Sequence, residues 1–184
     1  YKGVFKIGGI VRSFIQESVR GGRTMCADNR MLRISGNKVY QMTKDGEKMI
    51  KEYKNPVKLV DVDGVSLYPS AMYKSKGSLK GTPKILKKKE LNLNFLNKQS
   101  GFYVRIMITG VGKHREFPLL PYRGDNGSYI YNDRKWIGKT FVVSHIALED
   151  LVEFQQIKYK LLSGVYFNEG YNTNIKDAIL DMFK

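Results

Sequence analysis

The stretch that most constrains this chain runs from residue 57 to residue 73 and joins a predicted strand to a predicted helix. Residues 57–62 follow a proline and are rich in valine and leucine, a composition typical of a strand. Gly64 interrupts this pattern, and Ser66 is a residue type that caps helix N-termini. Residues 67–73 are therefore predicted to form one or two helical turns.

Two aspartates, Asp61 and Asp63, lie at the end of the predicted strand and face opposite sides of it. A carboxylate beside a helix N-terminus suits a divalent metal ion together with a phosphate, because the free N–H groups of the first helical turn face the anion. A core strand with two solvated aspartates and a capped turn explains the same residues. The residue types alone leave both interpretations open.

The sequence of residues 63–70, DGVSLYPS, resembles the first palm motif of family B DNA polymerases, Asp-x-x-Ser-Leu-Tyr-Pro-Ser. All six defined positions match. The resemblance implies a DNA-directed DNA polymerase, a nucleotidyltransferase that acts with two Mg²⁺ ions. It further implies that Asp63 bridges both metal ions, that the carbonyl of Gly64 completes one metal site, and that Asp61 is not a ligand.

The same resemblance implies a binding site for the incoming dNTP, formed by Gly64, Ser66, Leu67 and Tyr68. The backbone amides of Leu67 and Tyr68 would hold the β and γ phosphates. The Tyr68 ring would pack under the deoxyribose and exclude a 2′-hydroxyl.

Upstream, apolar residues at helical spacing predict an amphipathic helix over residues 4–18. The following segment, residues 18–23, reads SVRGGR and resembles a segment of the protein-primed family B polymerases of adenoviruses, certain phages and linear plasmids. The resemblance implies contacts with single-stranded template DNA, made by Arg20, Gly21, Gly22 and Arg23. The residues by themselves favour a helix C-cap followed by a turn.

Two segments between these motifs contain no recognisable catalytic or binding motif. Residues 31–42 alternate apolar and polar side chains around Gly36-Asn37 and predict a β-hairpin. Residues 43–55 are polar and rich in lysine, and we predict a surface excursion for them.

The charge of the chain is strongly positive and unevenly distributed. Residues 1–144 contain 28 basic and 11 acidic residues, whereas residues 145–184 contain 4 basic and 6 acidic ones. Such asymmetry is expected for a polyanionic partner. Seven lysines fall within residues 74–89, and we predict that an extended basic segment there, including Lys84, Lys87, Lys88 and Lys89, contacts DNA phosphates. A solvated loop is the alternative.

The remaining chain predicts a small mixed subdomain with antiparallel strands at residues 102–108, 127–131, 139–143 and 161–167, a Ser144-capped helix over residues 145–156 and a last helix over residues 174–183. This order is similar to the insertion of protein-primed polymerases where the priming terminal protein docks. The fold class is therefore expected to be α+β. We expect these parts: the linker helix and the start of the palm (1–76), a basic connection (77–99), the insertion (100–172) and a return helix (173–184).

Core or surface roles are predicted for His114, His145, Cys26 and Trp136. Tyr122, Tyr129 and Tyr131 interleave with arginines, as on a nucleic-acid face.

Other family motifs are absent from the sequence. The Asp-Thr-Asp segment that supplies the second metal carboxylate and the Lys-x-x-x-Asn-Ser-x-Tyr-Gly segment are not found. We therefore expect a polymerase piece, inactive alone, whose partners are template and primer DNA, dNTP, terminal protein and the remaining polymerase chain. The alternatives are a non-catalytic DNA-binding or terminal-protein-binding module and an unrelated basic adaptor. One cysteine and no apolar run near the roughly 20 residues of a membrane span predict an intracellular protein without a membrane partner.

Overall fold

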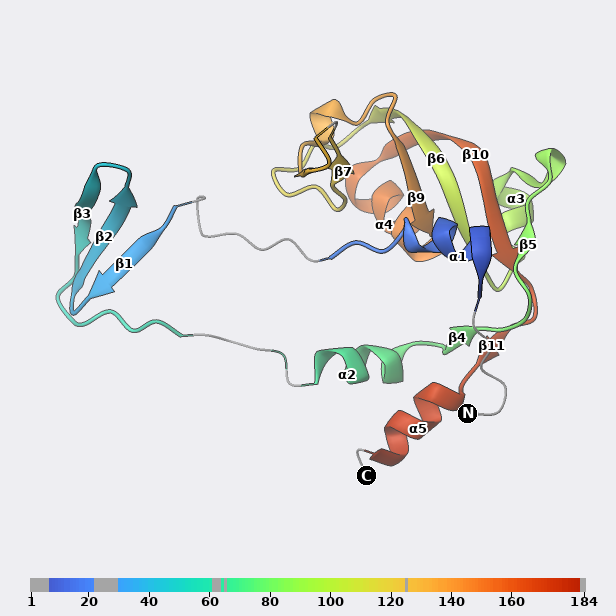
Figure 1. Ribbon diagram of the computed structural model, residues 1–184, viewed down its shortest axis with the longest axis horizontal. Helices are drawn as coiled ribbons and strands as arrows, with labels where there is room; N and C mark the ends of the chain where they lie inside the picture. The colour runs from blue at the N-terminus through green and yellow to red at the C-terminus, as the bar shows by residue number, and fades with distance from the viewer. Residues whose placement is uncertain (1–6, 22–29, 61–63, 65, 125, 183–184) are drawn as a thin grey trace. The chain divides into compact units, whose positions relative to one another are not determined.

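The computed structural model describes residues 7–21, 30–60, 64, 66–124 and 126–182 (Figure 1). Five α-helices and eleven strands occur among these residues, and every strand pair is antiparallel. The predicted α+β class is confirmed. The chain divides into two compact units, residues 1–20 with 68–184 and residues 21–67.

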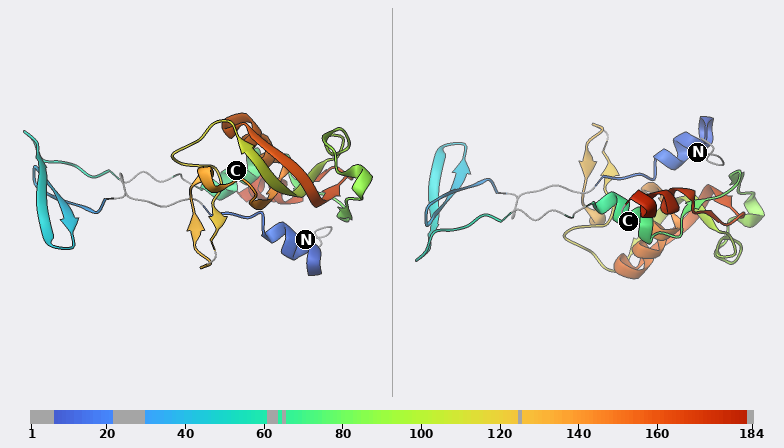
Figure 2. Two further views of the ribbon diagram at one scale, coloured as in Figure 1. Left: turned by 90° about the horizontal axis from the view of Figure 1, so that it is seen from above. Right: turned by 90° about the horizontal axis from the view of Figure 1, so that it is seen from below.

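The larger unit is built on a four-stranded sheet with the order β5-β10-β6-β9. Its strands are β5 (Lys84–Ile85), β10 (Ile157–Phe167), β6 (Gly101–Val111) and β9 (Thr140–Ser144). The two long strands, β6 and β10, run side by side along most of their length (Figure 2). Three predicted strands are thus confirmed, and two of them are longer than expected because each continues past the end of its apolar stretch.

Alternation along β6 places the core on one face of this sheet. Val104, Ile106 and Ile108 are at most 1% exposed, while the residues between them are half-buried. The helix α4 (His145–Gln155) contacts β6 and β9, and Trp136 is fully buried in the same cluster. The core role predicted for Trp136 is confirmed.

The sharp start of α4 follows from its N-cap. The hydroxyl of Ser144 accepts the N–H of Ala147 at 3.2 Å, as the sequence predicted. At the other end, Gln156 adopts the left-handed conformation with φ 49° and turns the chain directly into β10.

A buried polar network fastens the loop after β6 to α4. The Asp133 carboxylate, in the 3₁₀ turn η3 (Asp133–Lys135), accepts Gln155 Nε2 at 2.9 Å and the Arg115 N–H at 2.6 Å, and it contacts His114 Nδ1 at 3.0 Å. Asp133 and Gln155 are at most 2% exposed. Gln155 also accepts the N–H of Leu119 at 2.9 Å. The structural role predicted for His114 is confirmed.

Short elements complete the larger unit. They are α2 (Leu67–Lys74), β4 (Ser78–Leu79), which pairs with β11 (Tyr171–Asn172), the 3₁₀ turn η2 (Lys88–Glu90), α3 (Leu93–Leu96), β7 (Tyr122–Arg123), which pairs with β8 (Tyr129–Ile130), and α5 (Asn174–Met182). The predicted last helix is confirmed up to Met182. Tyr122 is buried, whereas Tyr129 is 55% exposed beside Arg123.

The predicted first helix is found as α1 (Gly9–Gln16). An ion pair holds it to the sheet, because Arg105 Nη2 on β6 lies 2.9 Å from Glu17 Oε2. The Arg105 guanidinium also lies 5.6 Å from the centre of the Phe14 ring.

The smaller unit contains a three-stranded sheet of β1 (Leu32–Ser35), β2 (Lys38–Thr43) and β3 (Gly46–Glu52). The predicted hairpin is confirmed, with Gly36 at φ 61° in its turn. Residues 43–55 are exposed throughout, as predicted, but the prediction missed that residues 46–52 form β3. Gly46, at φ 124°, lets the chain turn back and pair with β2 through backbone bonds, which require no apolar side chains.

The strand predicted at residues 57–62 is wrong for the part that the structure describes. Residues 57–60 form no strand, and Leu59 and Val60 are 84% and 75% exposed. A strand needs a neighbour to bond, and the described chain offers none beside residues 57–60. Their only backbone bond given by the structure runs from the Val57 N–H to the Gly36 carbonyl at 2.9 Å. Positions 61 and 62 lie outside the described residues.

Candidate functional site

The polymerase-like motif is carried by α2, which begins at Leu67. Ser66, immediately before it, has φ 50°, in the left-handed region instead of the extended backbone usual for an N-cap. A left-handed non-glycine residue costs roughly 1–2 kcal/mol, and such residues concentrate at functional sites. Asp63 lies outside the described residues, as does Asp61, so the metal-ligand assignment stays a prediction.

The side chains of α2 are unburied. Leu67 is 64% exposed and Tyr68 is 79% exposed. Gly64 is exposed as well. No side chain of α2 is therefore buried in a core, and a nucleotide site at its first turn stays a prediction.

The end of α2 is held to the start of α5. The Lys176 ammonium donates to the Ser75 carbonyl at 3.1 Å and lies 5.6 Å from the centre of the Tyr73 ring. Ser75 closes the helix, with its hydroxyl bonded to the Met72 carbonyl at 2.7 Å. These contacts join the C-terminal end of α2 to α5.

The lysine-rich segment, residues 74–89, is attached to the larger unit by its backbone at several points. The Lys80 N–H donates to the Gly170 carbonyl at 3.0 Å, and β5 pairs with β10. The Leu86 N–H donates to the Gly164 carbonyl at 2.9 Å, and the Leu86 side chain is buried. The segment is therefore an ordered edge of the sheet.

Two glycines make this attachment possible. A Cβ on Gly164 would lie 2.9 Å from Leu86 Cδ1 and 2.5 Å from the Tyr103 carbonyl oxygen. Gly81 has φ 90°, and a Cβ there would meet only the carboxylate of the exposed Glu169 side chain, which can rotate away. Gly164 therefore needs glycine because β6 packs where a side chain would stand, whereas Gly81 needs it for its left-handed backbone.

The lysine side chains themselves remain exposed. Lys84, Lys87, Lys88 and Lys89 are all exposed, and within the described part of the chain none has a carboxylate within ion-pair distance. The nearby Glu90 carboxylate accepts the backbone N–H of Lys87 at 2.8 Å, which closes η2. The backbone of the segment is therefore ordered, and contacts of its exposed lysines with DNA phosphates stay a prediction.

The glycine–arginine segment is described only at Arg20 and Gly21. The Arg20 guanidinium donates to the Glu17 carbonyl, and also to the Val19 carbonyl at 3.1 Å. It thus covers carbonyls at the end of α1, in agreement with the C-cap alternative for this segment. Gly22 and Arg23 lie outside the described residues, so template contacts by this segment remain a prediction.

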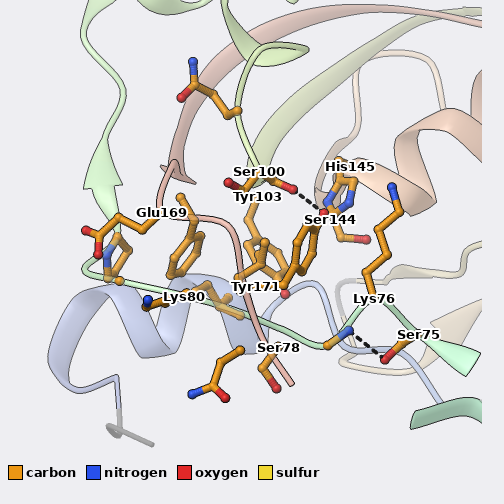
Figure 3. A pocket seen from close by; sticks show the side chains of 18 of the residues that line it. Ser75, Lys76, Ser78, Lys80, Ser100, Tyr103, Ser144, His145, Glu169 and Tyr171 are labelled. Carbon is orange, nitrogen blue, oxygen red and sulfur yellow. Dashed lines mark hydrogen bonds between the residues drawn. The ribbon is translucent and has the colours of Figure 1, made fainter. Parts of the chain in front are cut away.

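A groove that the sequence did not predict lies beside the lysine-rich segment and has a volume of about 1820 Å³. Figure 3 shows Lys76, Lys80, Tyr103, His145 and Tyr171 around it. Burial raises the pKa of Tyr103, and His145 Nδ1 is buried without a hydrogen-bond partner among the described residues. These residues come from four segments far apart in the sequence, so the groove could not be predicted from the spacing of its residues.

A metal site cannot be assembled from the described residues. They contain no group of three or more His, Cys, Asp or Glu side chains placed to hold an ion. The two Mg²⁺ ions implied by the motif need several carboxylates, and these residues do not supply that set.

No helix in the described part of the chain has the length and apolarity needed to cross a membrane. None of the family models, curated proteins or solved structures compared with the chain matches it.

Proposed function

We propose that this chain is part of a DNA-directed DNA polymerase of the protein-primed family B type, in which it contributes the first palm motif and a DNA-contacting basic segment. The observation that carries the proposal is the octapeptide at residues 63–70, with six of six defined positions matched. Its described part suits the role, because α2 starts at Leu67 and leaves Tyr68 exposed.

In this role the residues of α2 bind and orient the incoming nucleotide. The N–H groups of Leu67 and Tyr68 face its phosphates, and the Tyr68 ring lies under the sugar, where it leaves no room for a 2′-hydroxyl. Asp63 and the Gly64 carbonyl would hold Mg²⁺, together with carboxylates from the rest of an intracellular polymerase chain.

The basic segment would hold the DNA near this motif. Its four lysines, Lys84, Lys87, Lys88 and Lys89, project from an ordered backbone and are not neutralised by described carboxylates. Lysines that contact phosphates position a duplex without reading its sequence.

The test is primer extension by the complete polymerase chain with Mg²⁺ and dNTPs. Asp63→Asn is expected to reduce extension by at least roughly a hundredfold, because a metal ion contributes several kcal/mol and each 1.36 kcal/mol is a factor of ten. Asp61→Asn is the matched control and should retain near wild-type extension. The 184-residue chain alone is expected not to extend a primer. Extension by Asp63→Asn close to the wild-type rate would refute the assignment.

A second candidate is a non-catalytic DNA-binding or terminal-protein-binding module derived from such a polymerase. The ordered backbone of the lysine-rich segment favours this second candidate, since the segment needs no metal site to bind phosphates. Salt-sensitive DNA binding by a protein whose replication function is indifferent to Asp63→Asn would support this candidate over the first.

A further inference from the structure

The two faces of the sheet β1-β2-β3 carry different charges. Strand register assigns the side chains, because residues directly opposite each other in an antiparallel pair point to the same face. One face, here called the paired face, contains Arg33, Lys38, Tyr40, Met42, Glu47, Met49 and Glu52. The other, here called the open face, contains Leu32, Ile34, Val39, Gln41, Lys48 and Lys51.

The paired face is electrostatically self-contained. Arg33 Nε donates to Glu47 Oε1 at 2.8 Å, and this ion pair raises the pKa of Arg33. Lys38 Nζ lies 3.8 Å from Glu52 Oε1. Each basic side chain of this face therefore has an acidic neighbour.

The open face has basic groups and no acidic ones. Both glutamates of the sheet point to the paired face, and the remaining acid, Asp45, lies in the turn before β3. Lys48 and Lys51 have no carboxylate within ion-pair distance in the described part of the chain. Lys51 lies opposite Val39, which is 8% exposed, and Lys48 lies opposite Gln41.

An aromatic ring adjoins these lysines. Tyr53 follows β3 directly, is 42% exposed, and its ring centre lies 4.6 Å from Lys51 Nζ. Its backbone is held at both polar groups: its N–H donates to the Asn37 carbonyl at 2.9 Å, and its carbonyl accepts Asn37 Nδ2 at 2.8 Å. The ring therefore has a fixed attachment to the sheet.

We propose that the open face binds single-stranded nucleic acid, with Lys48 and Lys51 on phosphates and Tyr53 as a stacking platform for a base. Basic side chains that follow a backbone, combined with an aromatic ring, are the features by which proteins bind single strands without sequence preference. Residues 30–58 contain eight basic and three acidic residues, which favours a polyanion over a protein partner. The inference deepens the proposed function, on which it rests for its biological setting, but its chemistry does not involve Asp63.

The experiment uses the full chain and a fluorescently labelled oligo-dT of about 20 nucleotides, with anisotropy measured over a range of salt. Lys48→Ala/Lys51→Ala is expected to reduce the slope of log K against log salt by about 1.4, since each phosphate contact on a single strand contributes about 0.7. At 0.1 M salt this corresponds to about 25-fold weaker binding.

Arg33→Ala/Lys38→Ala is the matched control, because it removes the same charge from the same sheet on the other face. It should change the slope by much less than the open-face variant does. Tyr53→Ala is expected to weaken binding at least about fivefold through lost stacking, and Tyr53→Phe should bind like the wild type. Unchanged unfolding midpoints establish that each variant folds.

Equal losses in the two double variants would show that binding follows overall charge, and the proposal would be wrong. The same conclusion follows if a poly-glutamate peptide competes for the open face as well as oligo-dT does. Asp63→Asn should leave this binding unchanged, so failure of the primer-extension test and failure of the binding test can be distinguished.

Discussion

Replacing Gly164 with alanine is expected to destabilise the larger unit and loosen the lysine-rich segment. The new Cβ would lie 2.5 Å from the Tyr103 carbonyl oxygen and 2.9 Å from both Leu86 Cδ1 and Val104 Cγ1. The oxygen belongs to the backbone of the neighbouring strand, so β6 and β10 must move apart. Overpacking of this kind costs about 1–3 kcal/mol, and we place it at the upper end because no side-chain rotation relieves the clash.

Alanine recovers part of that loss, since it restricts the unfolded chain more than glycine does, by about 0.4–1 kcal/mol. The expected net loss in the free energy of unfolding is about 2 kcal/mol. For a chain of this size that corresponds to a melting temperature lower by about 4–8 °C.

Urea unfolding followed by the fluorescence of Trp136 measures this loss. Trp136 is the one tryptophan of the chain and is fully buried in the core that packs on this sheet. Gly110→Ala is the control, because its Cβ would meet only the Lys158 side chain at 3.6 Å, an ordinary contact. If both variants unfold at the same urea concentration, the close packing of Leu86 and Tyr103 on Gly164 is refuted.

Two further substitutions test the core and its ionisable groups. Asp133→Ala should lower the free energy of unfolding by about 3 kcal/mol, because the buried Gln155 amide and the Arg115 N–H lose their acceptor. The control Glu153→Ala, on the exposed side of α4, should change the free energy of unfolding by no more than about 0.5 kcal/mol. Urea unfolding of both variants measures the two values. Burial raises the pKa of Tyr103 above its usual value near 10, so above that pH the unfolded state loses a proton that the folded state keeps. Stability should therefore fall as pH rises above about 10, and Tyr103→Phe should show a shallower fall in melting scans between pH 8 and 11.

The sequence by itself determined the elements that have a strong local pattern. The helix α4 begins where Ser144 can cap it, and the alternation of residues 102–108 places Val104 and Ile106 in the core. The helix of the polymerase-like motif also starts at Leu67, where its sequence predicts. Caps and periodicity act within a few residues, so they can be recognised without knowledge of the fold.

Tertiary structure alone decided where polar and ambiguous segments lie. The polar β3 became a strand because β2 offered backbone partners, while the more apolar residues 57–60 found none. Backbone pairing also orders the lysine-rich segment, which bonds to β10 and β11. The Leu86 side chain packs in the space that Gly164 leaves free. Pairing and close packing depend on residues far apart in the chain, and local sequence carries no record of which partner will be present.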